Sequence, residues 1–197
     1  MRTIDIRGIT NMELVRGGTS EWYWATDYVH DDLYEAEELF RQKNSVQSNR
    51  LYLIHYPDGM VYEPVLPVDG QYLGYPVFDG ESVVLLVVNF TESAIHILRF
   101  LHQQEKTQEV VRLPLSAVKD CYNLILHPSP LSLTRQPNDG TFEIIWPEQI
   151  RFAISSRETL NFRDGDKLYF SIWYEDPDYR EETLVRSAQD GTVLERF

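Results

Sequence analysis

Two stretches of the chain are closely similar: residues 50–64, RLYLIHYPDGMVYEP, and residues 183–196, TLVRSAQDGTVLER. In each stretch a run of strand-forming residues leads into an Asp-Gly pair, and a second such run follows it. Asp-Gly supplies the positive φ that a tight turn requires, and it is a strong hairpin signal when apolar alternation flanks it. Both stretches are therefore predicted to be antiparallel hairpins.

The spacing of these hairpins indicates an internal repeat. Gly59 and Gly191 lie 132 residues apart, which is three times 44. A period of 44 predicts further turns near residues 104 and 148, and strand-like runs flank both places. The runs expected before the hairpins are 22–29, 83–90, 122–127 and 167–174, and the weaker upstream candidates are 12–16, 71–78, 117–121 and 158–162. The sequence thus predicts four units of four antiparallel strands.

The repeat resembles β-propeller-type repeat proteins in architecture, because its period matches the length of one propeller blade. The pattern shared by the two best hairpins is Asp-Gly-x-Val-x-Glu, and the resemblance covers residues 22–197. The repeat units lack the Gly-His and Trp-Asp pairs of one propeller class and a recurring glycine pair like that of kelch repeats, so no functional residue carries over.

We predict a single all-β domain over residues 1–197, with units at 1–66, 67–115, 116–155 and 156–197. A small or partial β-propeller is the expected architecture, and a β-sandwich built from the same hairpins is the alternative.

One short helix is expected over residues 33–41. Apolar residues recur there at helical spacing, and Asp31 or Asp32 can cap the N-terminus. We predict that Leu33, Ala36 and Phe40 face the sheet and that Glu35 and Glu38 face water.

Composition excludes several classes of protein. The chain has 197 residues, a net charge of −13 and a hydrophobic fraction of 43%, which is enough apolar material for a packed core. The negative charge disfavours binding to nucleic acid and to anionic membranes. The single cysteine, Cys121, forms no internal disulfide, and the longest apolar run, 83–88, is far too short to span a bilayer. We expect a soluble, cytoplasmic protein.

The motifs that would indicate catalysis or a cofactor are missing. The sequence has no Gly-x-Ser-x-Gly, no Gly-x-Gly-x-x-Gly, no Walker loop and no His-Glu-x-x-His. His96 and His102 are six residues apart on one expected strand, about 20 Å, which is too far for them to share a metal. We therefore expect no cofactor and no metal site.

Two segments that occupy corresponding positions in the first and last units combine aromatic rings with carboxylates. If the repeat closes on itself, these units become neighbours, and a ligand site is expected where the segments meet. That site consists of Tyr28, His30, Asp31, Tyr174, Glu175 and Asp176. An acidic site of this kind favours a neutral or cationic small molecule.

Our leading hypothesis is a non-catalytic binding or interaction domain, with a small molecule or a protein as its partner. The alternative from another class is a carbohydrate-active, glycosidase-like enzyme, whose paired carboxylates would come from a small set of acids. These acids are Asp27, Asp31, Glu175, Asp176 and Asp178. A homo-oligomer, in which an open arc of four units pairs with a second copy, is a further alternative.

Overall fold

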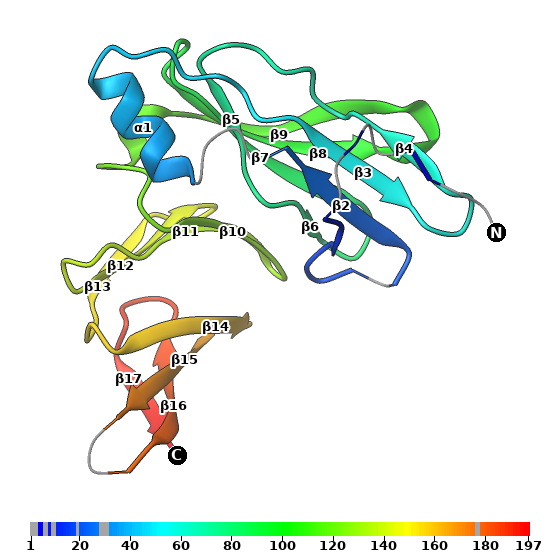
Figure 1. The fold of residues 1–197 in the computed structure, drawn as a ribbon. Helices are drawn as coiled ribbons and strands as arrows, with labels where there is room; N and C mark the ends of the chain where they lie inside the picture. The colour runs from blue at the N-terminus through cyan, green and yellow to red at the C-terminus, as the bar shows by residue number, and fades with distance from the viewer. Residues whose placement is uncertain (1–3, 6–7, 9–10, 19, 28–31, 176–177) are drawn as a thin grey trace. The chain divides into compact units, whose positions relative to one another are not determined.

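The computed structural model of the protein describes the chain except residues 1–3, 6–7, 9–10, 19, 28–31 and 176–177. The fold is all-β, as predicted: the described residues form four antiparallel sheets and one α-helix (Figure 1). The chain divides into two compact units, Met1–Cys121 and Tyr122–Phe197. Within the described residues, no helix combines the length and the hydropathy needed to cross a bilayer.

The first unit contains two sheets in which, apart from β5 and β6, successive strands of the chain are neighbours. The first sheet has the order β1 (Glu13–Leu14), β2 (Trp22–Thr26), β3 (Leu51–His55) and β4 (Met60–Tyr62). The second sheet has the order β5 (Gln71–Leu73), β7 (Val83–Asn89), β8 (Ala94–Leu101) and β9 (Lys106–Pro114), and β6 (Val77–Phe78) also pairs with β7.

The two sheets of the first unit share one hydrophobic core. Trp22 and Trp24 of β2 alternate into it, as do Leu51 and Leu53 of β3, because side chains along a strand point to opposite faces in turn. Leu85 of β7 packs in the same cluster. Every residue of β7 is buried, which explains why this strand is a continuous apolar run rather than an alternating one.

The second unit also contains two sheets. The third sheet has the order β10 (Leu124–Pro128), β11 (Leu131–Arg135), β12 (Thr141–Trp146) and β13 (Ile150–Ala153). The fourth sheet has the order β14 (Glu158–Asp164), β15 (Lys167–Tyr174), β16 (Arg180–Ser187) and β17 (Val193–Arg196). Their common core includes Phe142 and Phe170, whose rings meet edge to face with centroids 5.3 Å apart.

The four predicted turns are confirmed, because antiparallel strand pairs flank residues 59, 104, 148 and 191. The Asp-Gly pairs act through the carboxylate as well as the glycine. Asp58 Oδ1 accepts a hydrogen bond from the backbone N–H of Met60 at 2.9 Å, and Asp190 Oδ1 accepts the equivalent bond from Thr192 at 2.9 Å. Both aspartates therefore close their turns in the same way.

In the third sheet the strand prediction was partly wrong. Residues 117–121, predicted as a strand, begin at the last residue of a 3₁₀ turn (η2, Leu115–Ala117) and form no strand. The first strand is β10, and β11, which we did not predict, is the second. Pro128 ends β10 and Pro130 lies in the tight turn that follows, and these prolines masked a hairpin in which Pro128 pairs with Leu131.

The single α-helix among the described residues, α1 (Leu33–Arg41), has the predicted bounds. Asp32 caps it by accepting a hydrogen bond from the backbone N–H of Glu35 at 2.8 Å. Ala36 is buried and Glu38 is exposed, as predicted. Phe40 is less buried than expected, with 38% of its surface exposed, although its ring stacks on Phe90.

A buried carboxylate, Glu37, joins α1 to a distant part of the first unit. One oxygen accepts a hydrogen bond from the backbone N–H of Cys121 at 2.6 Å, and the other pairs with Arg41 at 2.6 Å. Arg41 also donates to the carbonyl of Lys119 at 3.0 Å. Burial, reinforced by the Glu37 carboxylate, raises the pKa of the Cys121 thiol, so this cysteine is protonated at neutral pH and is a poor nucleophile.

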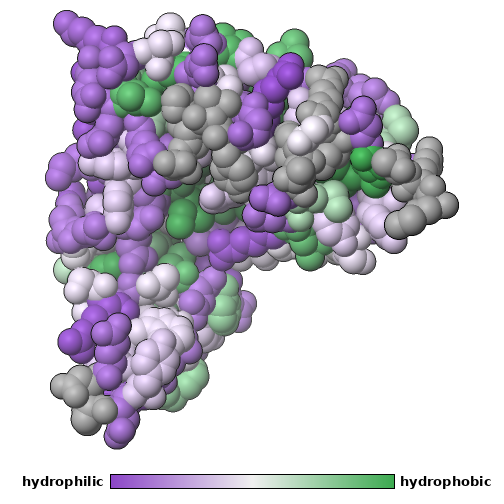
Figure 2. All heavy atoms as spheres, in the orientation of Figure 1, coloured by the Kyte–Doolittle hydropathy of each residue, from purple (hydrophilic) through white to green (hydrophobic). Residues whose placement is uncertain are grey.

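The face of the protein drawn in Figure 2 is mainly hydrophilic, and hydrophobic residues occur on it as small separate patches. Scattered apolar residues are ordinary on a protein surface. Hydropathy therefore does not mark a functional region on this face.

Candidate functional site

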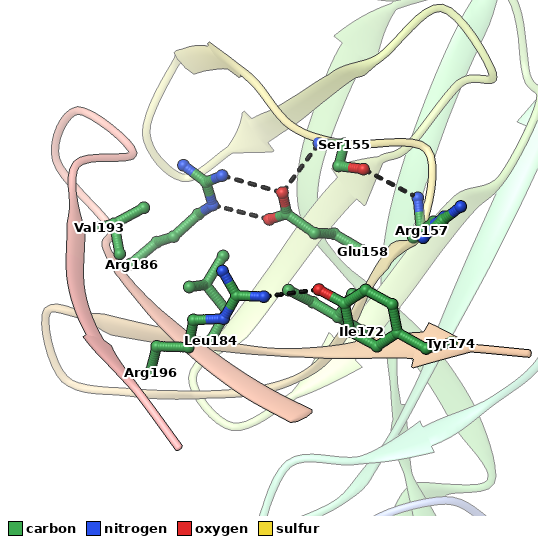
Figure 3. Close-up of a pocket in the computed structure, with 9 residues that line it drawn as sticks. All are labelled: Ser155, Arg157, Glu158, Ile172, Tyr174, Leu184, Arg186, Val193 and Arg196. Atoms are coloured by element: carbon green, nitrogen blue, oxygen red, sulfur yellow. Dashed lines mark hydrogen bonds and ion pairs between the residues drawn. The ribbon is translucent and has the colours of Figure 1, made fainter. Parts of the chain in front are cut away.

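A pocket of about 390 Å³ lies beside the fourth sheet, in the second unit (Figure 3). This volume is within the range typical of small-molecule sites. The pocket is lined by nine residues. They come from β15, β16 and β17, from the first residue of β14 and from the segment just before it. They are Ser155, Arg157, Glu158, Ile172, Tyr174, Leu184, Arg186, Val193 and Arg196.

The strand register explains why these side chains meet. Ile172 of β15 lies opposite Glu158 of β14, and Leu184 of β16 lies opposite Arg196 of β17. Residues directly opposite each other in an antiparallel pair project from the same face of the sheet. Ile172 and Leu184 also belong to the hydrophobic core of the second unit. The pocket therefore begins where the apolar face of the sheet becomes polar.

One wall of the pocket is a buried ion pair between Glu158 and Arg186. The guanidinium donates two parallel hydrogen bonds to the carboxylate, at 2.7 and 2.9 Å, and only 3% of the Glu158 side chain is exposed. Glu158 also accepts from the backbone N–H of Ser155 at 2.8 Å, and Arg186 donates to the carbonyl of Gly191 at 2.7 Å. This wall is rigid and electrically neutral.

Three arginines surround Tyr174. The guanidinium carbon of Arg180 lies 4.2 Å from the ring centroid, and that of Arg157 lies 5.5 Å from it. Arg196 donates a hydrogen bond to the Tyr174 hydroxyl at 2.5 Å. These contacts fix the ring, since guanidinium groups are attracted to the face of an aromatic ring.

The charges in and around the pocket are unequal. Arg180 and Arg196 both pair with Glu182, at 3.2 and 2.6 Å, and Arg196 leads the interactions that hold the pKa of this carboxyl below its usual value. Arg157, by contrast, makes no ion pair with any residue that the structure describes. The lining thus contains three arginines and one neutralised carboxylate, so the pocket carries a positive charge in an otherwise acidic protein.

Two of the residues predicted to form a ligand site lie within the described part of the chain. Tyr174 lines the pocket, and Glu175 is exposed immediately after β15. The other four, Tyr28, His30, Asp31 and Asp176, lie outside the described residues. The arginines that surround Tyr174 were not predicted as site residues from the sequence. The available signal was that Arg186 and Arg196 lie on the two strands of the last predicted hairpin, and that Arg157 immediately precedes a strand expected in the same unit.

The glycosidase-like alternative named five acids, and those that lie within the described residues are exposed. Asp27, in the first unit, accepts a hydrogen bond from the backbone N–H of Arg50 at 2.7 Å. Glu175 and Asp178 follow β15 in the second unit and do not line the pocket. The carboxylate that does line it, Glu158, is fully engaged by Arg186.

A second cluster lies in the first unit, where His55, Asp58 and His102 each place one candidate ligand atom within 4.8 Å of the others. This group was not predicted from the sequence, where His102 was compared only with His96 on the same expected strand. The available signal was that His55 and His102 both lie next to a predicted repeat turn, so the packing of the first two sheets could bring them together.

The comparisons with known proteins assign no function to either site: no protein-family model matches the chain, and no curated protein matches it with significant sequence similarity.

Proposed function

We propose that the protein is a non-catalytic binding protein, and that the pocket of the second unit binds a small organic anion. The ligand class is a carboxylate or phosphate attached to a flat apolar group. The observation that carries the proposal is the Arg157 guanidinium, which lies at a pocket beside an aromatic ring and has no ion-pair partner among the described residues.

The chemistry of the lining supports both parts of this ligand. A guanidinium presents a planar fork of donors that matches the two oxygens of a carboxylate or phosphate. Tyr174 offers a ring for stacking, and Ile172, Leu184 and Val193 supply apolar surface. The Glu158–Arg186 pair holds the opposite wall without adding net charge.

The proposed ligand class differs from the neutral or cationic ligand expected from the sequence. That expectation depended on acidic segments containing Asp31 and Asp176, which lie outside the described residues. The pocket around Tyr174 instead carries more arginine than carboxylate, and a positive site attracts anions even in a protein of net negative charge, because local charges dominate at short range.

The pocket gives less support to the carbohydrate-active alternative. Glycoside hydrolysis requires two carboxyl groups placed on either side of the scissile bond. The pocket contains one carboxylate, Glu158, and its ion pair with Arg186 leaves it unsuited to act as an acid or a nucleophile.

We also propose that the four sheets are blades of a propeller-type architecture. Three features support this: the strands of each sheet follow chain order almost throughout, the turns recur at the predicted spacing of about 44 residues, and the sheets within each unit pack through a common core.

Replacing Arg157 with glutamine is expected to weaken anion binding by about tenfold or more, because a hydrogen bond to a charged group contributes about 1.5–3 kcal/mol. The measurement is isothermal titration calorimetry with phenyl phosphate, benzoate, benzylamine and methyl glucoside as probes. The wild-type protein is expected to bind the first two in preference to the others, and their relative affinities distinguish phosphate from carboxylate recognition.

Arg151→Gln is the matched control, since Arg151 is an exposed arginine of the same unit that pairs with Glu143 and does not line the pocket. It should bind both anions as the wild type does. Equal loss in the two variants would show that only the general charge matters, and preferential binding of benzylamine or methyl glucoside would contradict the proposed ligand class.

A further inference from the structure

Two histidines from different sheets converge in the first unit. His55 is the last residue of β3 in the first sheet, and His102 follows β8 of the second sheet, in a short 3₁₀ turn (η1, His102–Gln104). Their ring centroids are 4.6 Å apart although 47 positions separate them in the chain. Their proximity is therefore produced by the packing of the two sheets.

Two oxygen-bearing side chains complete the cluster. His55 Nδ1 lies 2.9 Å from Asp58 Oδ2, and His102 Nε2 lies 2.9 Å from the Tyr62 hydroxyl. Asp58 belongs to the turn between β3 and β4, where it also accepts the backbone N–H of Met60. That hydrogen bond, followed by the one to His55, lowers the pKa of Asp58, so the carboxylate is ionised at neutral pH.

An aromatic wall orients the two imidazoles. The ring of Trp22, which is 6% exposed, lies 4.7 Å from that of His55 and meets the ring of His102 edge on at 5.1 Å. Buried packing of this kind restricts ring rotation. It leaves the polar side of the cluster open, since 46% of the Asp58 side chain is exposed to solvent.

We propose that His55, Asp58 and His102 form a binding site for a divalent transition-metal ion, with Zn²⁺ as the best match. Two imidazole nitrogens and one carboxylate oxygen are a common zinc donor set, and they leave a fourth position for water. Nitrogen donors disfavour Mg²⁺ and Ca²⁺, which prefer oxygen. The negative charge of the protein also attracts cations.

The site is distinct from the anion pocket, because it lies in the first unit and shares no residue with that pocket. Tetrahedral zinc places its ligand atoms about 3.3 Å apart, given metal–ligand distances of about 2.0–2.1 Å. The candidate atoms lie within 4.8 Å, so small side-chain movements suffice. A bound ion would link the turn after β3 to the turn after β8 and stabilise the first unit.

The test is calorimetric titration of ZnCl₂ into the full-length protein after treatment with a chelator and its removal. The wild type is expected to bind one equivalent of Zn²⁺ and to unfold at a higher temperature when Zn²⁺ is present. Asp58→Asn and His102→Gln should each weaken Zn²⁺ binding by at least about tenfold. Loss of a residue that only orients a metal ligand already lowers metal affinity by about that factor, and these two residues would be ligands themselves. Co²⁺ should give the visible absorption of a four-coordinate ion with the wild type and not with these variants.

The matched control is His96→Gln. His96 also contacts carboxylates, Glu109 at 2.7 Å and Glu92 at 3.9 Å, but it belongs to no cluster of the kind formed by His55, Asp58 and His102 among the described residues. It should bind Zn²⁺ as the wild type does. Asp58→Asn keeps an acceptor for the Met60 N–H, so it decides the question if His102→Gln does not fold. Absence of binding in the wild type, or undiminished binding by Asp58→Asn, would overturn the proposal.

Discussion

Replacement of Glu158 with alanine is expected to lower the free energy of unfolding of the second unit by about 3–5 kcal/mol, the cost typical of breaking a buried ion pair from one side. The Glu158 side chain is 3% exposed and that of Arg186 is 13% exposed. The variant leaves the Arg186 guanidinium without its counter-ion and the backbone N–H of Ser155 without its acceptor. Urea unfolding, with hydrogen exchange of β15 and β16 to report on the second unit, measures the loss.

Two further variants test the cause of this loss. Glu195→Ala removes an exposed carboxylate that pairs with Lys167, and we expect no resolvable change, because surface pairs contribute little. The double variant Glu158→Ala/Arg186→Ala should lose less free energy of unfolding than the two single variants lose together. When both partners are removed, no unpaired charge remains buried. Strict additivity would refute the ion pair as the source of the effect.

Replacement of Gly191 with alanine is expected to destabilise the second unit by about 2–5 kcal/mol, which combines the strain of positive φ with overpacking. Gly191 has φ +74°, and a Cβ added there would lie 2.1 Å from Cγ of Phe152. The Phe152 ring packs on Phe142 in the core, and the guanidinium carbon of Arg186 lies 6.0 Å from its centroid, so neighbours on both sides limit its movement. The urea midpoint of the variant measures the effect.

Gly165→Ala separates the two contributions. Gly165 also has a positive φ, +53°, but a Cβ added there meets nothing within 4 Å. We therefore expect this control to lose about 1–2 kcal/mol, from backbone strain alone. If both variants lose the same amount, the close approach of Phe152 does not limit the residue at position 191.

Local patterns in the sequence were sufficient to predict most of the fold. Asp58 and Asp190 close their turns with the hydrogen bonds that make Asp-Gly a turn signal, and Asp32 caps a helix whose apolar spacing fixed its bounds. Such signals lie within a few residues of each other. The strand β11 was missed because prolines lie at and within the turn before it, which made a hairpin resemble a loop.

The functional clusters could not be predicted in the same way, because their members are distant in the chain. His55 and His102 meet through sheet packing, and Glu158 and Arg186 meet across the fourth sheet. Placing such residues requires the strand register and the order of the sheets, which periodicity alone does not determine. Glu37 shows the same limit. It lies on the same helix face as Leu33 and Ala36, but glutamate is ordinarily exposed, and the backbone N–H that stabilises its buried carboxylate comes from a residue 84 positions away.

If the second unit binds a small organic anion beside Tyr174 and Arg157, a two-dimensional ¹H–¹⁵N NMR titration of the wild-type protein with phenyl phosphate will locate the binding at these residues. Saturable shifts are expected at the backbone amides of Arg157, Tyr174 and Val193, and benzylamine at the same concentrations should produce none of them. Shifts confined to the first unit, or the same shifts produced by benzylamine and not by phenyl phosphate, would contradict the proposed anion site.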